Sequence, residues 1–197
     1  MKRGLRAKLN LYEDYCGDNI EFELEGNIVR EKERNLKMIK HIKCDIFESG
    51  ADVICHQVNC QGVMGSGVAK TVKEKFPNVY QQYKNLCIGI TDPKKLLGYA
   101  QPCATDIEIK EEFCVVIFNL FAQENYGYDG KCYTDYAALR KCIETVKEVC
   151  AKDDVVAFPY LMGCHRGGGD WNVVYKMIEE IFADFDGEVL ICEYNGG

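Results

Sequence analysis

The pattern of apolar and polar residues changes period several times along the chain. Short and nearly continuous apolar runs are typical of strands that are buried on both faces of a sheet. ADVICHQV, at residues 51–58, is the clearest of them. The full set of predicted strands is 38–43, 51–58, 96–103, 113–122, 154–160 and 188–194.

Between these runs, apolar residues recur every three to four positions, which predicts amphipathic helices. The predicted helices cover residues 66–83, 134–150 and 171–182. Strands that alternate with helices are typical of a mostly parallel sheet with helices on both faces. Residues 1–37 are rich in charge, and we interpret them as an N-terminal extension that could form a β-hairpin. Residues 38–197 are then the main domain.

The composition narrows the function classes. The chain has 197 residues, of which 47% are hydrophobic and 28% are charged, as expected for a single globular domain. Its net charge of −7 argues against nucleic acid as the main partner. No secretory segment and no apolar run of membrane-spanning length occurs, so we expect a cytoplasmic protein without a membrane partner.

Twelve cysteines suggest a disulfide framework or a metal site, but their spacing favours neither. They form no CxxC pair, and several lie inside apolar runs, as Cys55 does. Thiols in such positions behave as small buried hydrophobic groups. With only three histidines and no paired ligand spacing, we expect no metal ion and no cofactor.

Two glycine-rich loops share one construction. CQGVMGSG, at residues 60–67, and LMGCHRGGG, at 161–169, each join a predicted buried strand to a predicted helix. The N-terminus of a helix offers unpaired N–H groups and a positive dipole end, which together bind anions. One such loop could be a simple turn, and neither is a Walker A or a GxGxxG motif. The pair, followed by Asp170 at the second helix start, predicts a clamp for a diphosphate.

From about residue 38 onward, the chain resembles the macrodomain family. The motifs that carry the resemblance are Asp45-Ile46, His56-Gln-Val-Asn59-Cys-Gln-Gly, Gly65-Ser-Gly-Val68, Asn119-Leu120-Phe121 and Gly163-Cys-His-Arg-Gly-Gly168. The resemblance implies an α/β fold, namely a three-layer α/β/α sandwich with a mixed, mostly parallel central sheet. It also implies ADP-ribose, or a derivative of it, as the ligand, with ADP-ribosylated macromolecules as further partners.

The resemblance assigns parts of the ligand to named residues. Asp45 and Ile46 would contact adenine, Tyr194 would stack on it, and Asn59 would hold the distal ribose. The two loops would hold the diphosphate. The complete implied set is Asp45, Ile46, Asn59, Gly65, Ser66, Gly67, Val68, Asn119, Leu120, Phe121, Gly163, Cys164, His165, Arg166, Gly167, Gly168 and Tyr194.

The resemblance implies fewer catalytic residues than ligand-binding residues. Ala69, Gln123 and Gly167 stand where hydrolase branches of the family place an acid, a lysine and an acid. His56 opens the H-x-x-N motif, as in the ADP-ribose 1″-phosphate phosphatase branch. The candidate catalytic residues are therefore His56, Asn59 and Asp129; Asp129 would orient a water or His56, or would simply make a turn.

Three hypotheses remain open at this point. The favoured one is a metal-independent hydrolase that acts at the distal ribose, most specifically an ADP-ribose 1″-phosphate phosphatase. The first alternative is a hydrolase for protein-linked or nucleic-acid-linked ADP-ribose, or a deacetylase for O-acetyl-ADP-ribose. The second alternative is a non-catalytic protein that binds ADP-ribose.

Overall fold

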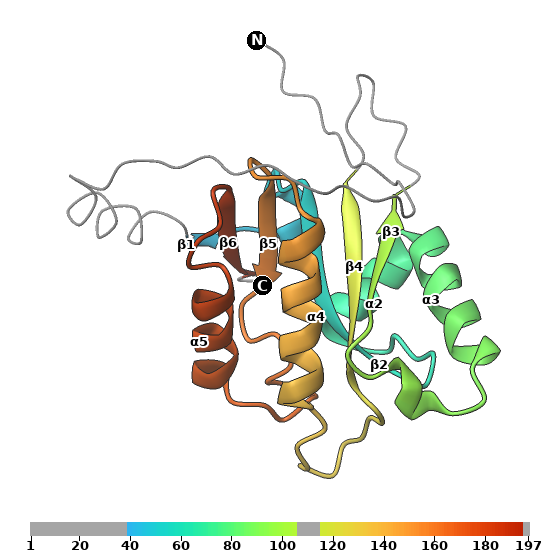
Figure 1. Ribbon diagram of the computed structural model, residues 1–197. Helices are drawn as coiled ribbons and strands as arrows, with labels where there is room; N and C mark the ends of the chain where they lie inside the picture. The colour runs from blue at the N-terminus through green and yellow to red at the C-terminus, as the bar shows by residue number, and fades with distance from the viewer. Residues whose placement is uncertain (1–38, 106–114, 195–197) are drawn as a thin grey trace, which may run out of the picture.

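A six-stranded sheet forms the centre of the molecule (Figure 1). The structure, a computed structural model, describes residues 39–105 and 115–194. The strand order is β1-β6-β5-β2-β4-β3, and every neighbouring pair is parallel except β3 and β4. The strands are β1 (Ile39–Lys43), β2 (Val53–Asn59), β3 (Ala100–Ala104), β4 (Val116–Gln123), β5 (Val155–Pro159) and β6 (Glu188–Glu193).

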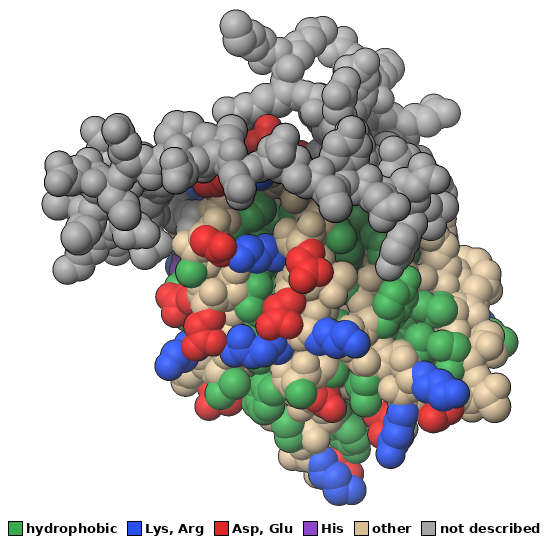
Figure 2. All heavy atoms as spheres, in the orientation of Figure 1, with side chains coloured by type: hydrophobic (Ala, Val, Ile, Leu, Met, Phe, Trp, Pro, Cys, Tyr) green, Lys and Arg blue, Asp and Glu red, His purple; other side chains and the backbone are tan. Residues whose placement is uncertain are grey.

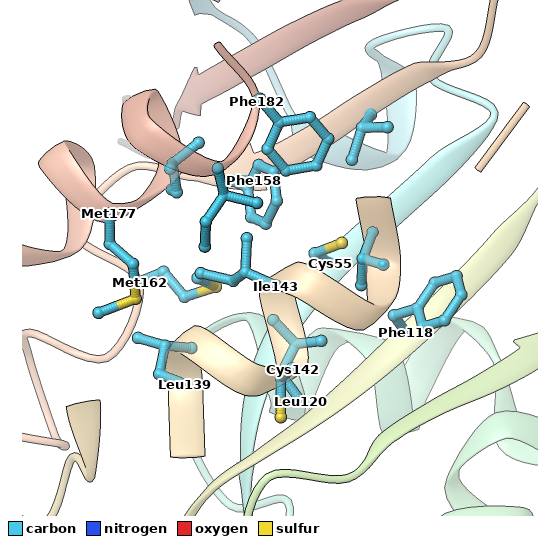
Figure 3. Close-up of a cluster of buried hydrophobic side chains, with 14 of the residues drawn as sticks. Cys55, Phe118, Leu120, Leu139, Cys142, Ile143, Phe158, Met162, Met177 and Phe182 are labelled. Atoms are coloured by element: carbon cyan, nitrogen blue, oxygen red, sulfur yellow. The ribbon is translucent and has the colours of Figure 1, made fainter. Parts of the chain in front are cut away.

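Helices cover both faces of the sheet and complete a three-layer α/β/α sandwich. The elements are α2 (Gly67–Lys75), α3 (Pro77–Gly89), α4 (Tyr136–Val149), α5 (Trp171–Ile181) and the 3-10 helices η1 (Ile46–Glu48) and η2 (Pro93–Leu96). The core between the sheet and α4 and α5 includes Leu139, Ile143 and Phe158 (Figure 3). A second core under α2 and α3 includes Val72, Val79 and Tyr83. The predicted fold class is thus confirmed.

The predicted helix over 66–83 is wrong as a single element. The structure breaks it at Phe76, whose φ of −130° and ψ of 71° are not helical, and α3 begins at Pro77. Proline lacks an N–H donor and disfavours helical geometry in the residue before it, so it ends one helix and starts the next. The break turns α3 toward β3, which lies at an edge of the sheet.

The other predicted strands and helices lie within residues 39–105 and 115–194, which the structure describes, except for the first residues of two strands. Predicted residue 38 and the 1–37 extension lie outside them, as do predicted strand residues 113 and 114.

The outer face of α4 and α5 mixes acidic and basic side chains (Figure 2). Ion pairs join Arg140 to Glu180 and Lys147 to Asp184 on this face. No helix of the described part is long and apolar enough to cross a membrane.

The cysteines of the described residues are all free thiols. Burial raises the pKa of the Cys55 thiol well above its usual value, and it raises that of Cys142 to about 12. Such thiols stay protonated at neutral pH and pack as small apolar groups. In the described residues, no group of three or more His, Cys, Asp or Glu side chains is placed to hold a metal ion.

Candidate functional site

A cavity of about 520 Å³ opens at the carboxyl ends of β2 and β5. These two strands are neighbours in the sheet, so the glycine-rich loops that follow them lie side by side. The lining residues come from both loops and from the segment after β4. They are His56, Gln57, Val58, Asn59, Val63, Gly65, Ser66, Gly67, Val68, Ala69, Gln123, Tyr126, Tyr128, Pro159, Tyr160, Leu161, Met162, Gly163, His165, Arg166 and Gly167.

The N-terminus of α2 forms one wall of the cavity. Ser66 is the extended N-cap residue, and its side chain makes no capping hydrogen bond. The first helical hydrogen bond runs from Lys70 N to Ser66 O, so the N–H groups of Gly67, Val68 and Ala69 have no partner within the helix. Gly67 has a φ of +56°, a value that glycine adopts without a side-chain clash. This wall can accept an anion.

Asn59 holds the first glycine-rich loop in shape. Its Oδ1 accepts hydrogen bonds from Gln61 N at 2.9 Å and from Tyr83 Oη at 2.9 Å. Its Nδ2 donates to Val63 O at 2.6 Å. The side chain therefore ties both ends of the turn to the end of β2. Its implied contact with a ribose stays a prediction.

A partly buried chain of hydrogen bonds holds the second loop. Gln57 Nε2 donates to Thr134 Oγ1 at 2.9 Å, and Thr134 Oγ1 donates to Gly163 O at 2.8 Å. Gly163 has a φ of +74°, and a Cβ there would collide with the Gln57 side chain. A Cβ on Gly167 would collide with Gly163 O and with Thr134. Glycine therefore fits this close packing at both positions, whereas a larger residue would displace the Gln57 and Thr134 side chains or the loop backbone.

His56 lies at the inner end of the cavity and is only 1% exposed. Its Nε2 lies 2.7 Å from Asn119 Oδ1. Burial lowers the pKa of His56 from 6.5 to about 4, against a smaller opposite effect of the Asn119 contact. The imidazole is therefore neutral at pH 7 and can accept a hydrogen bond. Its predicted catalytic role stays a prediction.

Two tyrosines and one arginine line the cavity together: Tyr126, Tyr128 and Arg166. The Arg166 guanidinium lies 4.4 Å from the centre of the Tyr128 ring, in a cation–π contact that joins the second glycine-rich loop to the segment after β4. Tyr126 lines the same side. Among the described residues that line the cavity there is no Lys, Asp or Glu.

No family model matches the chain. The chain is 40% identical over 68 residues to an ADP-ribose 1″-phosphate phosphatase of Scheffersomyces stipitis, a match that covers 31% of this chain and 39% of that protein. It is 26% identical over 163 residues to a DNA ADP-ribosyl glycohydrolase of Thermus aquaticus, with coverages of 79% and 41%. The matches span about two fifths of the lengths of these relatives.

Solved structures share the fold over most of the chain. The macrodomain of Mycobacterium tuberculosis DarG matches with a TM-score of 0.63 and 21% identity over 80% of this chain and 97% of that one. The chain therefore has the fold of a macrodomain. Thermosipho africanus DarTG in complex with ADP-ribose matches the chain with a TM-score of 0.65 and 20% identity, over 79% of this chain and 41% of that one.

The structure brings most of the predicted loop residues to one cavity. The residues shared by the prediction and the cavity lining are His56, Asn59, Gly65, Ser66, Gly67, Val68, Gly163, His165, Arg166 and Gly167. Cys164 and Gly168 flank them in sequence but do not line the cavity. Ala69 and Gln123, which replace the acid and the lysine of other branches, do line it.

Three predicted ligand contacts are not at the cavity. Asn119, Leu120 and Phe121 lie in β4 with side chains that are completely buried. β4 is an interior strand, between β2 and β3, so its side chains pack into the layers of the sandwich. Their predicted ligand contacts stay predictions.

Asp129 does not meet His56. Its carboxylate accepts a hydrogen bond from Tyr133 Oη at 2.8 Å and forms an ion pair with Lys131 at 2.8 Å. The Lys131 and Tyr133 contacts lower the pKa of this exposed carboxyl to about 2. The residue does not line the cavity, and no hydrogen bond joins it to His56 among the described residues. Its role in orienting a water stays a prediction.

The predicted adenine contacts lie apart from the cavity lining. Asp45 caps η1 by accepting from Phe47 N at 3.0 Å, and it pairs with Lys75 at 3.1 Å. Ile46 is buried, and Tyr194 is 72% exposed after the end of β6. Their adenine contacts stay predictions.

Sequence reasoning missed Gln57 and Thr134, which fix the second loop, and Tyr126 and Tyr128 at the mouth. A signal for the tyrosines existed, because the polar, glycine-punctuated segment after a buried strand is typical of a functional loop. No sequence signal links Gln57 to Thr134, because 77 positions separate them.

Proposed function

We propose that the cavity binds ADP-ribose, with the diphosphate between the N-terminus of α2 and the loop at residues 163–167. The observation that supports this most strongly is the unpaired set of N–H groups at Gly67, Val68 and Ala69, which faces the second loop across one cavity. A cavity of about 520 Å³ also suits a ligand of nucleotide size. The relative solved with ADP-ribose has the same fold.

We further propose that the protein hydrolyses the bond between the distal ribose of ADP-ribose and DNA. Two curated matches that cover about four fifths of the chain, 79% for Thermus aquaticus and 81% for Mycobacterium tuberculosis, are to proteins named DNA ADP-ribosyl glycohydrolase. In such a hydrolysis the glycosidic bond at C1″ breaks and a water oxygen bonds to C1″. The DNA atom of that bond leaves with the bonding electron pair and takes up the proton that the water releases. The loops would fix the ADP-ribose part of the substrate, and such positioning supplies a large part of an enzyme's rate.

The lining residues restrict how the water is activated. No lysine, aspartate or glutamate among the described residues lines the cavity, so a lysyl adduct or a carboxylate base is not supported. His56 is neutral at pH 7 and lines the inner end. It would accept a hydrogen bond from the attacking water.

The phosphatase is the second candidate. The S. stipitis relative is 40% identical, though over 68 residues only, and it carries the name of this activity. His56 at the start of the H-x-x-N motif and Arg166 at the cavity mouth favour it, because a terminal phosphate would gain a charge-assisted contact. A protein that binds ADP-ribose without turnover is the third outcome.

One panel assay separates these functions. The protein is incubated with an ADP-ribosylated single-stranded oligonucleotide, ADP-ribose 1″-phosphate, ADP-ribosylated protein and O-acetyl-ADP-ribose. Release of ADP-ribose from the oligonucleotide, lost in His56→Ala, supports the proposed function. Turnover of the 1″-phosphate alone supports the phosphatase. Calorimetric binding without any turnover refutes both activities and leaves the binding proposal.

A further inference from the structure

A chain of polar side chains crosses three strands beneath the cavity. Asn119 on β4 is the register partner of both His56 on β2 and Gln101 on β3. His56 Nε2 lies 2.7 Å from Asn119 Oδ1, and Asn119 Nδ2 donates to Gln101 Oε1 at 3.0 Å. Asn119 is completely buried, so its amide has no access to water. The Asn119 side chain thus connects His56 to Gln101.

The direction of this chain decides the tautomer of His56. Asn119 Nδ2 donates to Gln101 and also lies 3.5 Å from Cys103 Sγ, which leaves Oδ1 as the atom that faces His56. An amide oxygen only accepts, so His56 Nε2 must carry the ring proton. Nδ1 is then an acceptor, and it is buried without a partner among the described residues. Buried N–H groups without a partner are rarer than buried acceptors without one, which agrees with this assignment.

We infer that Asn119, held by Gln101, is a positioning residue that fixes His56 as the Nε2–H tautomer and leaves Nδ1, which is closed to solvent in this structure, as the acceptor that a bound hydroxyl group would meet. The hydroxyl belongs to the attacking water or to the distal ribose. The tautomer stands on the hydrogen bonds alone. Only the identity of the group that meets Nδ1 rests on the proposed function. The role of Asn119 is thus to orient His56 and not to touch the ligand.

Nuclear magnetic resonance tests the tautomer directly. The chain has three histidines, and His41 and His165 are exposed, so they serve as internal controls. Long-range ¹H–¹⁵N correlations at pH 7.5 report which ring nitrogen carries the proton. We expect His56 to show a protonated Nε2 and an unprotonated Nδ1. A protonated Nδ1, or the averaged pattern of a free histidine, overturns the inference.

Variants of Gln101 test the positioning without a change in the buried Asn119. Gln101 is half-buried on an edge strand, so Gln101→Leu is expected to fold. Gln101→Leu removes the acceptor of Asn119 Nδ2, so the Asn119 amide can turn. The correlations of His56 should then show a mixture of the Nε2–H and Nδ1–H tautomers. Gln101→Glu keeps the acceptor and should keep the wild-type pattern. Gln81→Leu, an exposed position on α3, is the matched control. An unchanged pattern in Gln101→Leu contradicts the role of Gln101.

Kinetics on the substrate that the panel identifies give the second readout. Gln101→Leu should lower kcat about tenfold with KM within about twofold, because a misoriented base affects the chemical step and not substrate binding. A rise in KM as large as the fall in kcat contradicts a positioning role. If ADP-ribose does not bind while the tautomer pattern is as expected, the proposed function fails and the tautomer assignment stands. If ADP-ribose binds and the pattern is averaged, the inference fails alone.

Discussion

The buried imidazole of His56 should make the stability of the fold depend on pH in a predictable way. Burial lowers its pKa from 6.5 to about 4 in the folded protein. Because the folded pKa is the lower one, the contribution to stability is fully present above pH 6.5 and is lost as the pH falls toward 4. One pKa unit corresponds to about 1.4 kcal/mol, so the shift is worth about 3 kcal/mol in total. About 2 kcal/mol of this should already be lost at pH 5.

Urea unfolding followed by the fluorescence of Trp171, the single tryptophan, measures this effect. His56→Gln removes the titrating group at similar volume, and His165→Gln is the exposed control. The difference in unfolding free energy between wild type and His56→Gln should shrink by about 2 kcal/mol from pH 7 to pH 5. His165→Gln should follow the wild-type curve. Parallel curves for wild type and His56→Gln would refute the account of a neutral, buried imidazole.

Three further predictions concern the loops and the start of α5. Thr134→Val removes the hydrogen bond to Gly163 O and the one from Gln57 Nε2. It should lower the unfolding free energy by about 1–3 kcal/mol in urea titrations and the affinity for ADP-ribose about tenfold, whereas Thr145→Val, at a half-buried position on α4, should change neither. Arg166→Gln should weaken ADP-ribose binding about threefold at low salt in calorimetry through loss of the cation–π and charge contacts, and an unchanged Kd would place Arg166 outside the site. Asp170→Ala removes the cap of α5 and should cost about 1 kcal/mol in thermal unfolding, with binding unchanged.

Much of the fold could be predicted from the chain because the apolar pattern changes period at each element. The run around Cys55 predicted a strand buried on both faces, and β2 is an interior strand of the sheet. The break at Pro77 was also accessible, since proline starts helices and disfavours helical geometry before itself. The antiparallel pairing of β3 could not be predicted, because it depends on strand order and not on local pattern.

The site could be predicted only in part. The two glycine-rich loops were recognisable because each joins a buried strand to a helix. That they meet depends on β2 and β5 being neighbours, which the sequence pattern does not contain. Asn119 was assigned to the ligand by its motif, whereas its place beside His56 and Gln101 follows from the register of β4, which the motif does not contain. Thr134 acts through contacts with distant residues, so only the structure identifies it.

Calorimetric titration of ADP-ribose into the wild type, Gly67→Val and Gly50→Val tests the central claim. Both glycines have positive φ, +56° and +75°, and open space where a Cβ would lie, so both variants should lose about 1–2 kcal/mol of stability. Gly67 lines the cavity and Gly50 does not. Saturable one-site binding to wild type and Gly50→Val, at least about tenfold weaker in Gly67→Val, is the predicted result. Absence of binding to the wild type, or equal binding by Gly67→Val, would contradict the claim that the two loops grip ADP-ribose.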